Sequence, residues 1–259
     1  EKISEELNIG LDSIVFFDDN PVERDWVRKQ LPNVKVIEVP KSPMDYLKAL
    51  NKSTFFDRLA VTNEDKSRAN IYQQEQQRKS DLSNSVSVDD FLKDLKMTVK
   101  IGFSDDMTIT RIEQLLNKTN QFNLTTKRHS SADLIKIIRD GGKVLWLSST
   151  DRYGDNGIVG VAILVKIQQD GWLIDSLLLS CRVIGRKIET IFLAEIIEIL
   201  RNDNVDVVYG QYLPTKKNNI VSNFYNQHGF QLTDKKNNLW KFNVNESYIT
   251  KPNYIEVYK

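Results

Sequence analysis

Cysteine and histidine are scarce in this sequence, which restricts the chemistry that its side chains can perform. The 259 residues include one cysteine, Cys181, and two histidines, His129 and His228. A single cysteine cannot form an intrachain disulfide, and so few thiols and imidazoles do not supply the ligand spacing of a zinc site. We therefore expect no metal held through cysteine or histidine. Cys181 is either a buried strand residue, which we favour, or a thiolate whose pKa is lowered by Arg182 and the start of the next helix.

Net charge and long apolar runs are missing as well. The 36 basic side chains nearly balance the 35 acidic ones, so the overall field does not favour binding to nucleic acid. No apolar run approaches the roughly 18 residues needed to cross a bilayer, and the first residues do not resemble a secretory signal. These absences predict a cytoplasmic protein that binds neither nucleic acid nor a membrane. The chain begins at Glu1, as expected of a fragment of a longer protein.

The amino-terminal segment has the pattern of one βαβ unit. An apolar run over 13–17 predicts a buried strand, a helical segment follows Pro21, and 34–39 predicts a second strand. Asp18 and Asp19 stand at the carboxyl end of the first strand, where side chains can face a crevice. They are either the remnant of a metal site or the cap of the next helix.

Strand and helix patterns alternate over the rest of the chain, after a polar, helix-favouring stretch. From residue 97 the order is a strand, two helices, three strands, a helix, a strand, a helix and two strands. This order predicts an α/β protein with a mixed sheet and flanking helices. The predicted segments are 1–42 for the βαβ unit, 43–95 for a helical linker, 96–245 for the main domain and 246–259 for a tail.

The most informative segment is a strand that runs directly into an amphipathic helix over 177–200. Its tight turn contains Gly185 and leaves the first backbone N–H groups of the helix without partners, where the helix dipole favours an anion. Arg182, Arg186 and Lys187 lie in the same turn. The turn is either a phosphate-binding site or an ordinary strand-to-helix connection.

Two motifs resemble signatures of the GNAT acyltransferase fold, which has this order of elements. The turn Arg182-Val183-Ile184-Gly185-Arg186-Lys187 is similar to the (Q/R)xxGx(G/A) loop, whose backbone amides hold the pyrophosphate of an acyl-CoA. The segment 219–230 resembles the second signature, Asn-x-x-x-x-x-Tyr-x-x-x-Gly-Phe. Lys187 departs from the pattern, because Gly or Ala is usual at its position. The resemblance implies that CoA or phosphopantetheine is bound by this turn and by Asn219, whose alternative role is that of a helix cap.

The chain as a whole resembles the carboxyl-terminal part of FkbH-like proteins. Five segments carry the resemblance: SIVFFDDNPVERDWV, QLLNKTNQFNLTT, DRYGDNGIVGVA, SCRVIGRKIE and NNIVSNFYNQHGF. Those proteins join a HAD-type domain, of a phosphatase subfamily, to a GNAT-like domain. Members are associated with loading a glyceryl unit from bisphosphoglycerate onto the phosphopantetheine thiol of an acyl carrier protein, in polyketide or other secondary metabolite biosynthesis. The resemblance implies a carrier protein and a small-molecule acyl donor as partners.

The same resemblance makes residues 1–42 the remnant of a HAD-like domain. HAD chemistry needs an aspartate nucleophile in a DxDx(T/V) loop and Mg²⁺ held by acidic side chains. Asp18 and Asp19 resemble the acidic pair, but the nucleophile loop is absent from this sequence. We expect an incomplete metal site and no phosphatase activity from this fragment, since Mg²⁺ belongs to the full-length HAD domain.

Further site residues follow from the resemblance. Tyr225 stands where GNAT enzymes often place the general acid that reprotonates a thiolate leaving group, and its alternative role is that of a half-buried helix aromatic. The amide-rich loop after the first helix of the main domain lies on the acceptor side in such folds. It predicts a substrate-facing wall or, alternatively, a self-satisfied loop. The candidate substrate-binding residues are Asn120, Gln121, Phe122 and Asn123.

Two classes of function remain. In the first, the main domain is an acyltransferase that positions a phosphopantetheine thioester for direct attack by a bound acceptor, with Tyr225 as the acid. In the second, it is a non-catalytic unit that presents an acidic carrier protein to the HAD domain through basic side chains. The basic candidates for docking are Arg186, Lys187, Lys216 and Lys217.

Overall fold

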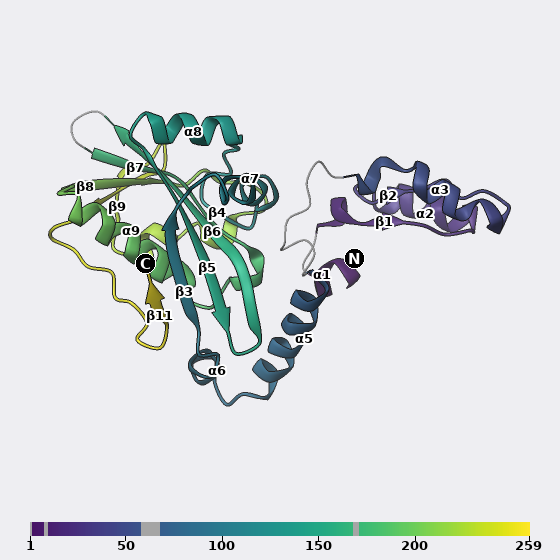
Figure 1. Cartoon of the computed structure of the whole chain (residues 1–259), viewed down its shortest axis with the longest axis horizontal. Coiled ribbons are helices and arrows are strands. Elements are labelled where there is room, and N and C mark those ends of the chain that lie inside the picture. Colours follow the sequence, from purple (N-terminus) through teal and green to yellow (C-terminus); the bar gives the residue numbers. More distant parts are fainter. Residues whose placement is uncertain (1, 8–9, 58–67, 168–170) are drawn as a thin grey trace. The chain divides into compact units, whose positions relative to one another are not determined.

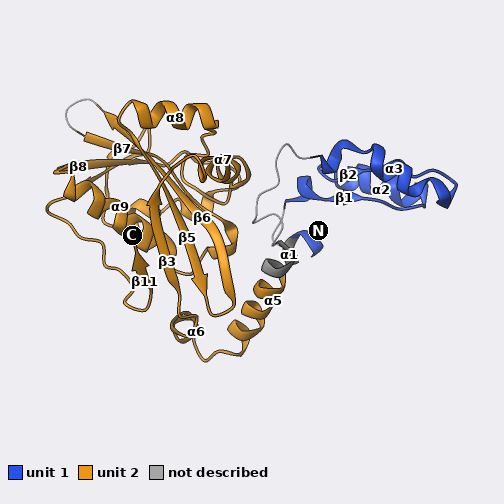
Figure 2. Ribbon diagram, viewed as in Figure 1, with its two compact units in different colours: residues 1–72 blue, residues 73–259 orange. Residues whose placement is uncertain are grey.

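The computed structural model describes residues 2–7, 10–57, 68–167 and 171–259 (Figure 1). They belong to two compact units, which span 1–72 and 73–259 (Figure 2). Helix α5 (Arg68–Asn84) contains the boundary between the units. The division of the sequence into the segments 1–42, 43–95, 96–245 and 246–259 remains a prediction.

Unit 1 contains the expected βαβ motif. Strand β1 (Val15–Phe16) pairs in parallel with β2 (Lys35–Val36), and α2 (Pro21–Gln30) joins them. The Asn20 side chain caps α2 by accepting a hydrogen bond of 3.0 Å from a backbone N–H of its first turn, and Pro21 takes the first helical position. The other elements of this unit are α1 (Lys2–Leu7), η1 (Leu11–Ser13), η2 (Pro43–Asp45), α3 (Tyr46–Lys52) and η3 (Thr54–Phe56).

Unit 2 is built around a sheet of nine strands among the described residues. The sheet is mixed, as the sequence predicts for the main domain, although two of its strands, β4 and β11, are not in the predicted order. Eight strands follow the order β11-β3-β5-β6-β7-β8-β10-β9, and β4 pairs beside β7. The β7–β8 and β11–β3 pairs are parallel and the others are antiparallel. The strands are β3 (Thr98–Phe103), β4 (Phe122–Asn123), β5 (Lys143–Asp151), β6 (Gly154–Ile167), β7 (Gly171–Leu179), β8 (Val207–Gln211), β9 (Gln231–Asp234), β10 (Leu239–Asn243) and β11 (Glu256–Tyr258).

Side chains of the central strands form cores on both faces of this sheet. Along β6, Val161 and Ile163 pack in the cluster that contains α7 and α8, whereas Ala162 and Leu164 belong to the cluster that contains α9. The sheet is therefore covered by helices on both sides. Besides α5, the helices of unit 2 are α6 (Val88–Asp94), α7 (Ile109–Lys118), α8 (Ser131–Arg139), η4 (Cys181–Val183), α9 (Ile188–Asn202), η5 (Asn219–Val221) and α10 (Phe224–Gln227).

The parallel strands β7 and β8 part after a short paired stretch. They pair from Trp172 to Ile174 only, and Asp175 is a bulge, because β6 pairs with Ile174 and then with Ser176. Beyond the bulge, β4 takes the place beside β7. The backbone of Leu124 continues this contact by donating to Leu177 and accepting from Leu213. The opening between β7 and β8 is thus closed by the segment 122–124.

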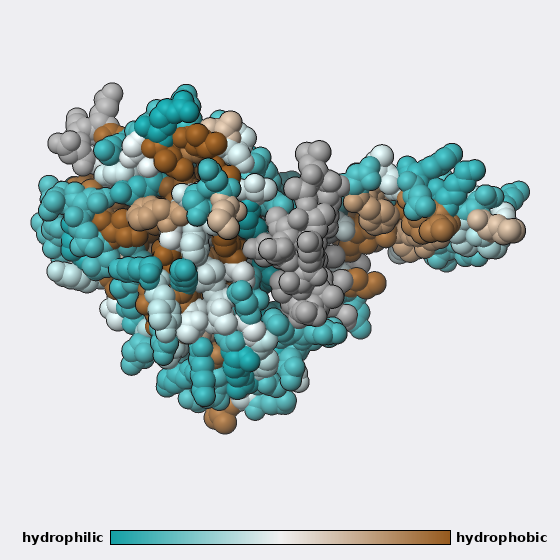
Figure 3. All heavy atoms as spheres, viewed as in Figure 1, coloured by the Kyte–Doolittle hydropathy of each residue, from teal (hydrophilic) through white to brown (hydrophobic). Residues whose placement is uncertain are grey.

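Polar side chains cover most of the face that Figure 3 displays, with hydrophobic ones gathered near α8. There Ile135 and Ile138 are 45% and 41% exposed. Within the described part of the chain, none of the helices combines the length and the apolarity that crossing a membrane requires.

Candidate functional site

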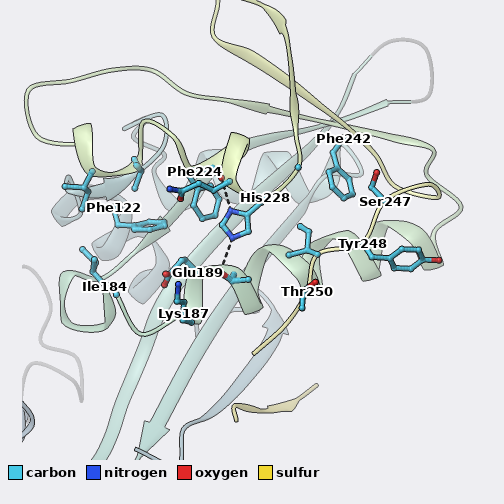
Figure 4. A pocket seen from close by; sticks show the side chains of 17 residues that line it. Phe122, Ile184, Lys187, Glu189, Phe224, His228, Phe242, Ser247, Tyr248 and Thr250 are labelled. Atoms are coloured by element: carbon cyan, nitrogen blue, oxygen red, sulfur yellow. Dashed lines mark hydrogen bonds between the residues drawn. The ribbon is translucent and has the colours of Figure 1, made fainter. Parts of the chain in front are cut away.

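A cavity of about 850 Å³ lies between the start of α9 and the segment that contains η5 and α10 (Figure 4). This volume is within the range of small-molecule sites. Phe122, Phe224, Phe242 and Tyr248 form its aromatic walls. Polar groups on its walls include those of Lys187, Glu189, Thr190 and His228.

The turn before α9 adopts a conformation that places two left-handed residues beside the cavity. Gly185 has φ +79°, and a Cβ at this position would meet no other atom within 4 Å, so the space over it is open. Lys187 has φ 64° although it is not glycine, which is an uncommon and strained conformation for a long side chain. The turn thus presents an open backbone and one cation to the cavity.

A buried ion-pair network holds the same turn from its other side. Arg78 of α5 makes two hydrogen bonds of 2.8 Å to the Asp151 carboxylate, and only 3% and 1% of these side chains are exposed. Arg186 lies 3.3 Å from the same carboxylate and 2.7 Å from Glu75 of α5. Two guanidinium groups therefore face two carboxylates. Arg186 is not among the residues that line the cavity, and its ion pairs engage its own guanidinium group, which is thus not available to a phosphate or to an acidic docking partner.

His228 joins two elements across the cavity wall. Its Nδ1 lies 2.8 Å from the carbonyl oxygen of Phe224, and its Nε2 lies 2.9 Å from Oγ1 of Thr190 in α9 (Figure 4). Burial lowers the pKa of His228, and the nearby Lys187 lowers it further, against a raising effect of the Phe224 carbonyl. The imidazole is therefore neutral at neutral pH.

Glu189 brings a carboxyl group to the start of α9. Burial raises the pKa of Glu189, while the backbone amides of Glu189 and Lys187 and the Lys187 charge act to lower it. Its Oε2 atom finds no hydrogen-bond partner among the residues that the structure describes. The start of the helix is thus occupied partly by the chain's own acidic side chain.

Tyr225, the predicted acid, is not among the residues that line the cavity. Its side chain is buried, and its ring packs against Gly210 of β8 and against Phe230. The hydroxyl has no hydrogen-bond partner in the described structure. Burial and the nearby Asp175 carboxylate raise the pKa of Tyr225. A phenol left without a partner in this way costs roughly 1–3 kcal/mol.

The four residues of the loop that is predicted to face the substrate differ in their contacts. Phe122 lines the cavity and contacts Phe224 edge-to-face, with ring centroids 5.5 Å apart. Asn123 is buried and satisfied by its own loop, since its amide donates to the carbonyl of Thr119 and accepts from two backbone N–H groups. Asn120 pairs with a nearby arginine, and Gln121 is exposed. Of the four residues, Phe122 alone is among those that line the cavity.

The helical segment after β8 begins with η5 at Asn219. This is one residue earlier than the start at Ile220 that a capping role of Asn219 would require. Asn218 is fully buried, and its amide donates to the carbonyls of Asn123 and Leu213 at 2.8 and 3.0 Å. Asn219 is exposed and lies inside η5. The neighbouring asparagine, which the sequence analysis passed over, is thus the one that holds this segment to β4.

The remaining residues of the predicted cofactor site divide in the same way. Ile184, Gly185 and Lys187 line the cavity, whereas Arg182, Val183 and Asn219 do not. Cys181 begins η4 rather than standing in a strand, it is half-buried, and burial raises the pKa of its thiol. A raised pKa disfavours the thiolate, so this cysteine is a poor nucleophile.

Asp18 and Asp19 are engaged by local contacts in unit 1. Asp18 accepts a hydrogen bond of 2.8 Å from the backbone N–H of Asn20, and Arg24 donates to the carbonyl oxygens of both aspartates. Mg²⁺ prefers near-octahedral oxygen coordination. Among the described residues, no group of three or more His, Cys, Asp or Glu side chains is placed to hold a metal ion. These two residues alone do not fit a magnesium site, and we derive no chemistry from one.

Asp175, at the β7 bulge, anchors a second polar cluster away from the cavity. Lys127 and His129 lie 2.6 and 2.9 Å from its two carboxylate oxygens. Burial alone would raise the pKa of Asp175, but the hydrogen bonds from His129 and Lys127 outweigh it and hold the pKa at about 2.

The Asp175→Asn variant is expected to lose about 1–2 kcal/mol of unfolding free energy at pH 7, after discounting for solvent screening. An aspartate has a pKa near 4 in the unfolded chain, so the depressed pKa stabilises the fold above that pH and stops doing so as pH falls towards 2. Urea unfolding at several pH values checks this. The gap between wild type and variant should narrow below pH 4; a gap that stays constant there would contradict the ion-pair explanation.

The comparisons with known proteins concern the fold of this chain. No protein-family model matches it, and no curated protein matches its sequence. A GNAT-family acetyltransferase from Staphylococcus aureus is 14% identical, with 56% of this chain and 99% of that one covered and a TM-score of 0.45. A Mycobacterium tuberculosis protein solved in complex with CoA is 15% identical over 52% of this chain and 72% of that one, with a TM-score of 0.41.

A third solved structure is similar over a shorter stretch. It is the N-terminal part of a Bacteroides fragilis protein, contains a phosphatase domain and was solved with Mg. It is 47% identical over 23% of this chain and 16% of that one, with a TM-score of 0.23.

Proposed function

We propose that unit 2 is the acyl-transfer domain of an FkbH-like protein and that its cavity holds the phosphopantetheine arm of an acyl thioester, carried on CoA or on an acyl carrier protein. The observation that carries the proposal is the position of the cavity. Ile184, Gly185 and Lys187 come from the first GNAT-like motif, and Phe224 and His228 come from the second. The two motifs that imply a thioester ligand therefore meet at one cavity.

The chemistry of the walls suits such a ligand. A pantetheine arm has an aliphatic stretch that aromatic walls can cover and a phosphate that a cation can bind. Phe122 and Phe224 supply aromatic surface, Lys187 supplies the cation, and Gly185 leaves the backbone open to close approach. In the parent protein we propose that this domain takes part in moving a glyceryl-type unit onto a carrier protein.

Protonation of the leaving thiolate completes an acyl transfer. Tyr225 stays the predicted donor on the strength of the motif alone. Its raised pKa makes it a weak acid, and the Tyr225→Phe variant tests its role through the rate of transfer.

Reversing the charge of Lys187 should weaken ligand binding. The Lys187→Glu variant is expected to bind CoA and holo carrier protein at least about tenfold more weakly, because the added carboxylate at the cavity wall repels the phosphate. A tenfold change in the dissociation constant corresponds to about 1.4 kcal/mol. Isothermal titration calorimetry on the full chain measures the dissociation constants. Lys217→Glu is the matched control, because Lys217 is exposed and is not among the residues that line the cavity.

The same titrations can reject the proposal. CoA, acetyl-CoA and a holo carrier protein all failing to bind the wild type at millimolar concentrations would rule out a pantetheine site. Equal losses from Lys187→Glu and Lys217→Glu would instead favour electrostatic docking of the carrier protein outside the cavity.

A further inference from the structure

The start of α9 carries an acidic side chain at the place where the proposed function puts the phosphate of the ligand. Glu189 is the second residue of α9, and it lines the cavity together with Lys187 (Figure 4). Burial raises the pKa of Glu189, whereas the backbone amides of Glu189 and Lys187 and the Lys187 charge favour its ionised form. The chain's own carboxylate therefore uses the amides and the cation that a phosphate at this turn would use.

The carboxylate of Glu189 is only partly compensated by these groups. Its Oε2 atom is buried and has no hydrogen-bond partner among the described residues, although each carboxylate oxygen can accept hydrogen bonds. A buried oxygen without a partner interacts more strongly with other charges than one that is solvated or paired. Negative charge is thus left at the cavity wall, where it acts on any charged ligand that enters.

Few other charges at the wall can offset this carboxylate. The charged side chains among the described residues that line the cavity are Lys187 and Glu189, and His228 is neutral because burial lowers its pKa. Arg186, the cation next to Lys187 in the turn, is engaged in buried ion pairs and is not among the lining residues. The described wall therefore has one cation, one anion and almost no net charge.

The two carriers of a pantetheine arm differ in the charge that they bring to such a wall. A carrier protein holds the arm through one phosphodiester, which has a single negative charge. CoA holds it through a diphosphate, which has a second negative charge, and it has a further phosphate on its ribose. Lys187 can balance a single charge. Each additional charge meets repulsion from Glu189, and such repulsion is one of the two ways in which a site discriminates between ligands.

We propose that Glu189 is a specificity-determining residue, which makes the cavity favour the singly charged phosphodiester of a carrier-bound arm over the diphosphate of CoA. The inference rests on the proposed function for the pantetheine arm, and it assigns the choice between the two carriers to one side chain. Discrimination comes from repulsion of the wrong ligand rather than from added contacts with the right one.

Removal of the carboxylate should improve CoA binding, and a folding defect cannot produce such a gain. Isothermal titration calorimetry of the full chain uses pantetheine, phosphopantetheinyl serine amide and CoA, at about pH 8 so that the carboxyl group is ionised. The wild type should bind the phosphodiester most tightly. The Glu189→Gln variant is expected to bind CoA at least about tenfold more tightly than the wild type, the phosphodiester at most about threefold more tightly, and pantetheine with unchanged affinity.

Two control variants separate the charge of Glu189 from its shape and from general effects on the helix. Glu198→Gln makes the same substitution in α9 at a residue that is not among those lining the cavity, so its affinities should match those of the wild type. Glu189→Asp keeps the charge and should keep the preference for the phosphodiester. A tenfold gain in CoA binding from Glu189→Asp as well would show that shape sets the preference, and it would overturn the proposal.

The ligands also distinguish the possible failures. If the wild type binds CoA as tightly as the phosphodiester, or if Glu189→Gln leaves the ratio of the two dissociation constants within about twofold of the wild-type ratio, the proposal is overturned while the proposed function stands.

Inorganic pyrophosphate, which has no pantetheine part, identifies the opposite failure. If no pantetheine compound binds and Glu189→Gln binds pyrophosphate at least about tenfold more tightly than the wild type, repulsion of a diphosphate by Glu189 is supported and the proposed function fails. If this gain is absent as well, both proposals fail.

Discussion

The Asp151→Asn variant is expected to lose about 3–5 kcal/mol of unfolding free energy relative to the wild type, the largest stability change that we predict for a polar residue. Asp151 is the shared partner of two buried guanidinium groups, those of Arg78 and Arg186. Its replacement leaves both cations to Glu75, which lies 3.4 Å from Arg78 and 2.7 Å from Arg186. A buried cation that loses its partner retains the cost of its desolvation, and this cost sets the size of the effect.

The measurement is urea unfolding of the full chain at neutral pH, followed by circular dichroism. Asp155→Asn is the matched control, because Asp155 is an exposed carboxylate at the start of β6, the strand that pairs with β5 beside Asp151. Its loss should stay within about 0.5 kcal/mol. Similar small losses in both variants would mean that the network contributes little and that α5 is held to unit 2 by other contacts.

The buried ion pairs of Asp151 give a structural role to the DRYGDN segment, to which the proposed function assigns none. The DRYGDN segment predicts a hairpin turn from its glycine and asparagine, and this turn is present between β5 and β6. Its first residue, Asp151, serves a different purpose, since it receives Arg78 from α5 and Arg186 from the turn before α9. The segment thus ties the helix that contains the boundary between the units to one edge of the cavity.

Most strands and helices of this fold can be predicted from local sequence patterns. Alternating apolar residues predict the strands and spaced ones predict α9, because burial of one face is a property of neighbouring residues. Strand β11 is the exception. It is three residues long and lies in the segment predicted as a tail, and only its pairing with β3 makes it a strand.

The candidate site is harder to predict from the sequence than the fold is, because its contacts join residues that are far apart in the sequence. Arg186 and Lys187 are adjacent in the sequence and look equally suited to an anion, yet one side chain meets α5 and the other lines the cavity. Side-chain direction in a turn depends on the left-handed residues within it, which the sequence marks only at Gly185.

Thr190 and His228 show a different limit. Each lies within or directly after a recognised motif, and His228 is one of two histidines in the chain. A scarce imidazole inside a signature segment was the available signal. No sequence signal marks Thr190, because a threonine in the first turn of a helix is ordinary. Only the approach of α10 to α9 brings its hydroxyl to His228.

The Gly210→Ala variant is expected to lose about 3 kcal/mol or more of unfolding free energy, although it adds a single methyl group. A Cβ at this position would lie 2.3 Å from two ring carbons of Tyr225 and 2.8 Å from a third. The ring is buried between β8 and Phe230, so it has little room to retreat. Gly171→Ala is the control, because its nearest contacts are 3.3–3.4 Å and ask for only a slight adjustment.

A double-mutant cycle separates this clash from a general intolerance of β8 to side chains. Tyr225→Ala removes the ring and leaves a cavity, so it destabilises on its own. In that background the added methyl group meets open space, and the cost of Gly210→Ala should fall by at least about 2 kcal/mol. An unchanged cost would show that the glycine is needed for the strand itself. A reduced cost would mean that the absence of a side chain at Gly210 makes room for the buried ring of Tyr225, whose hydroxyl has no hydrogen-bond partner among the described residues.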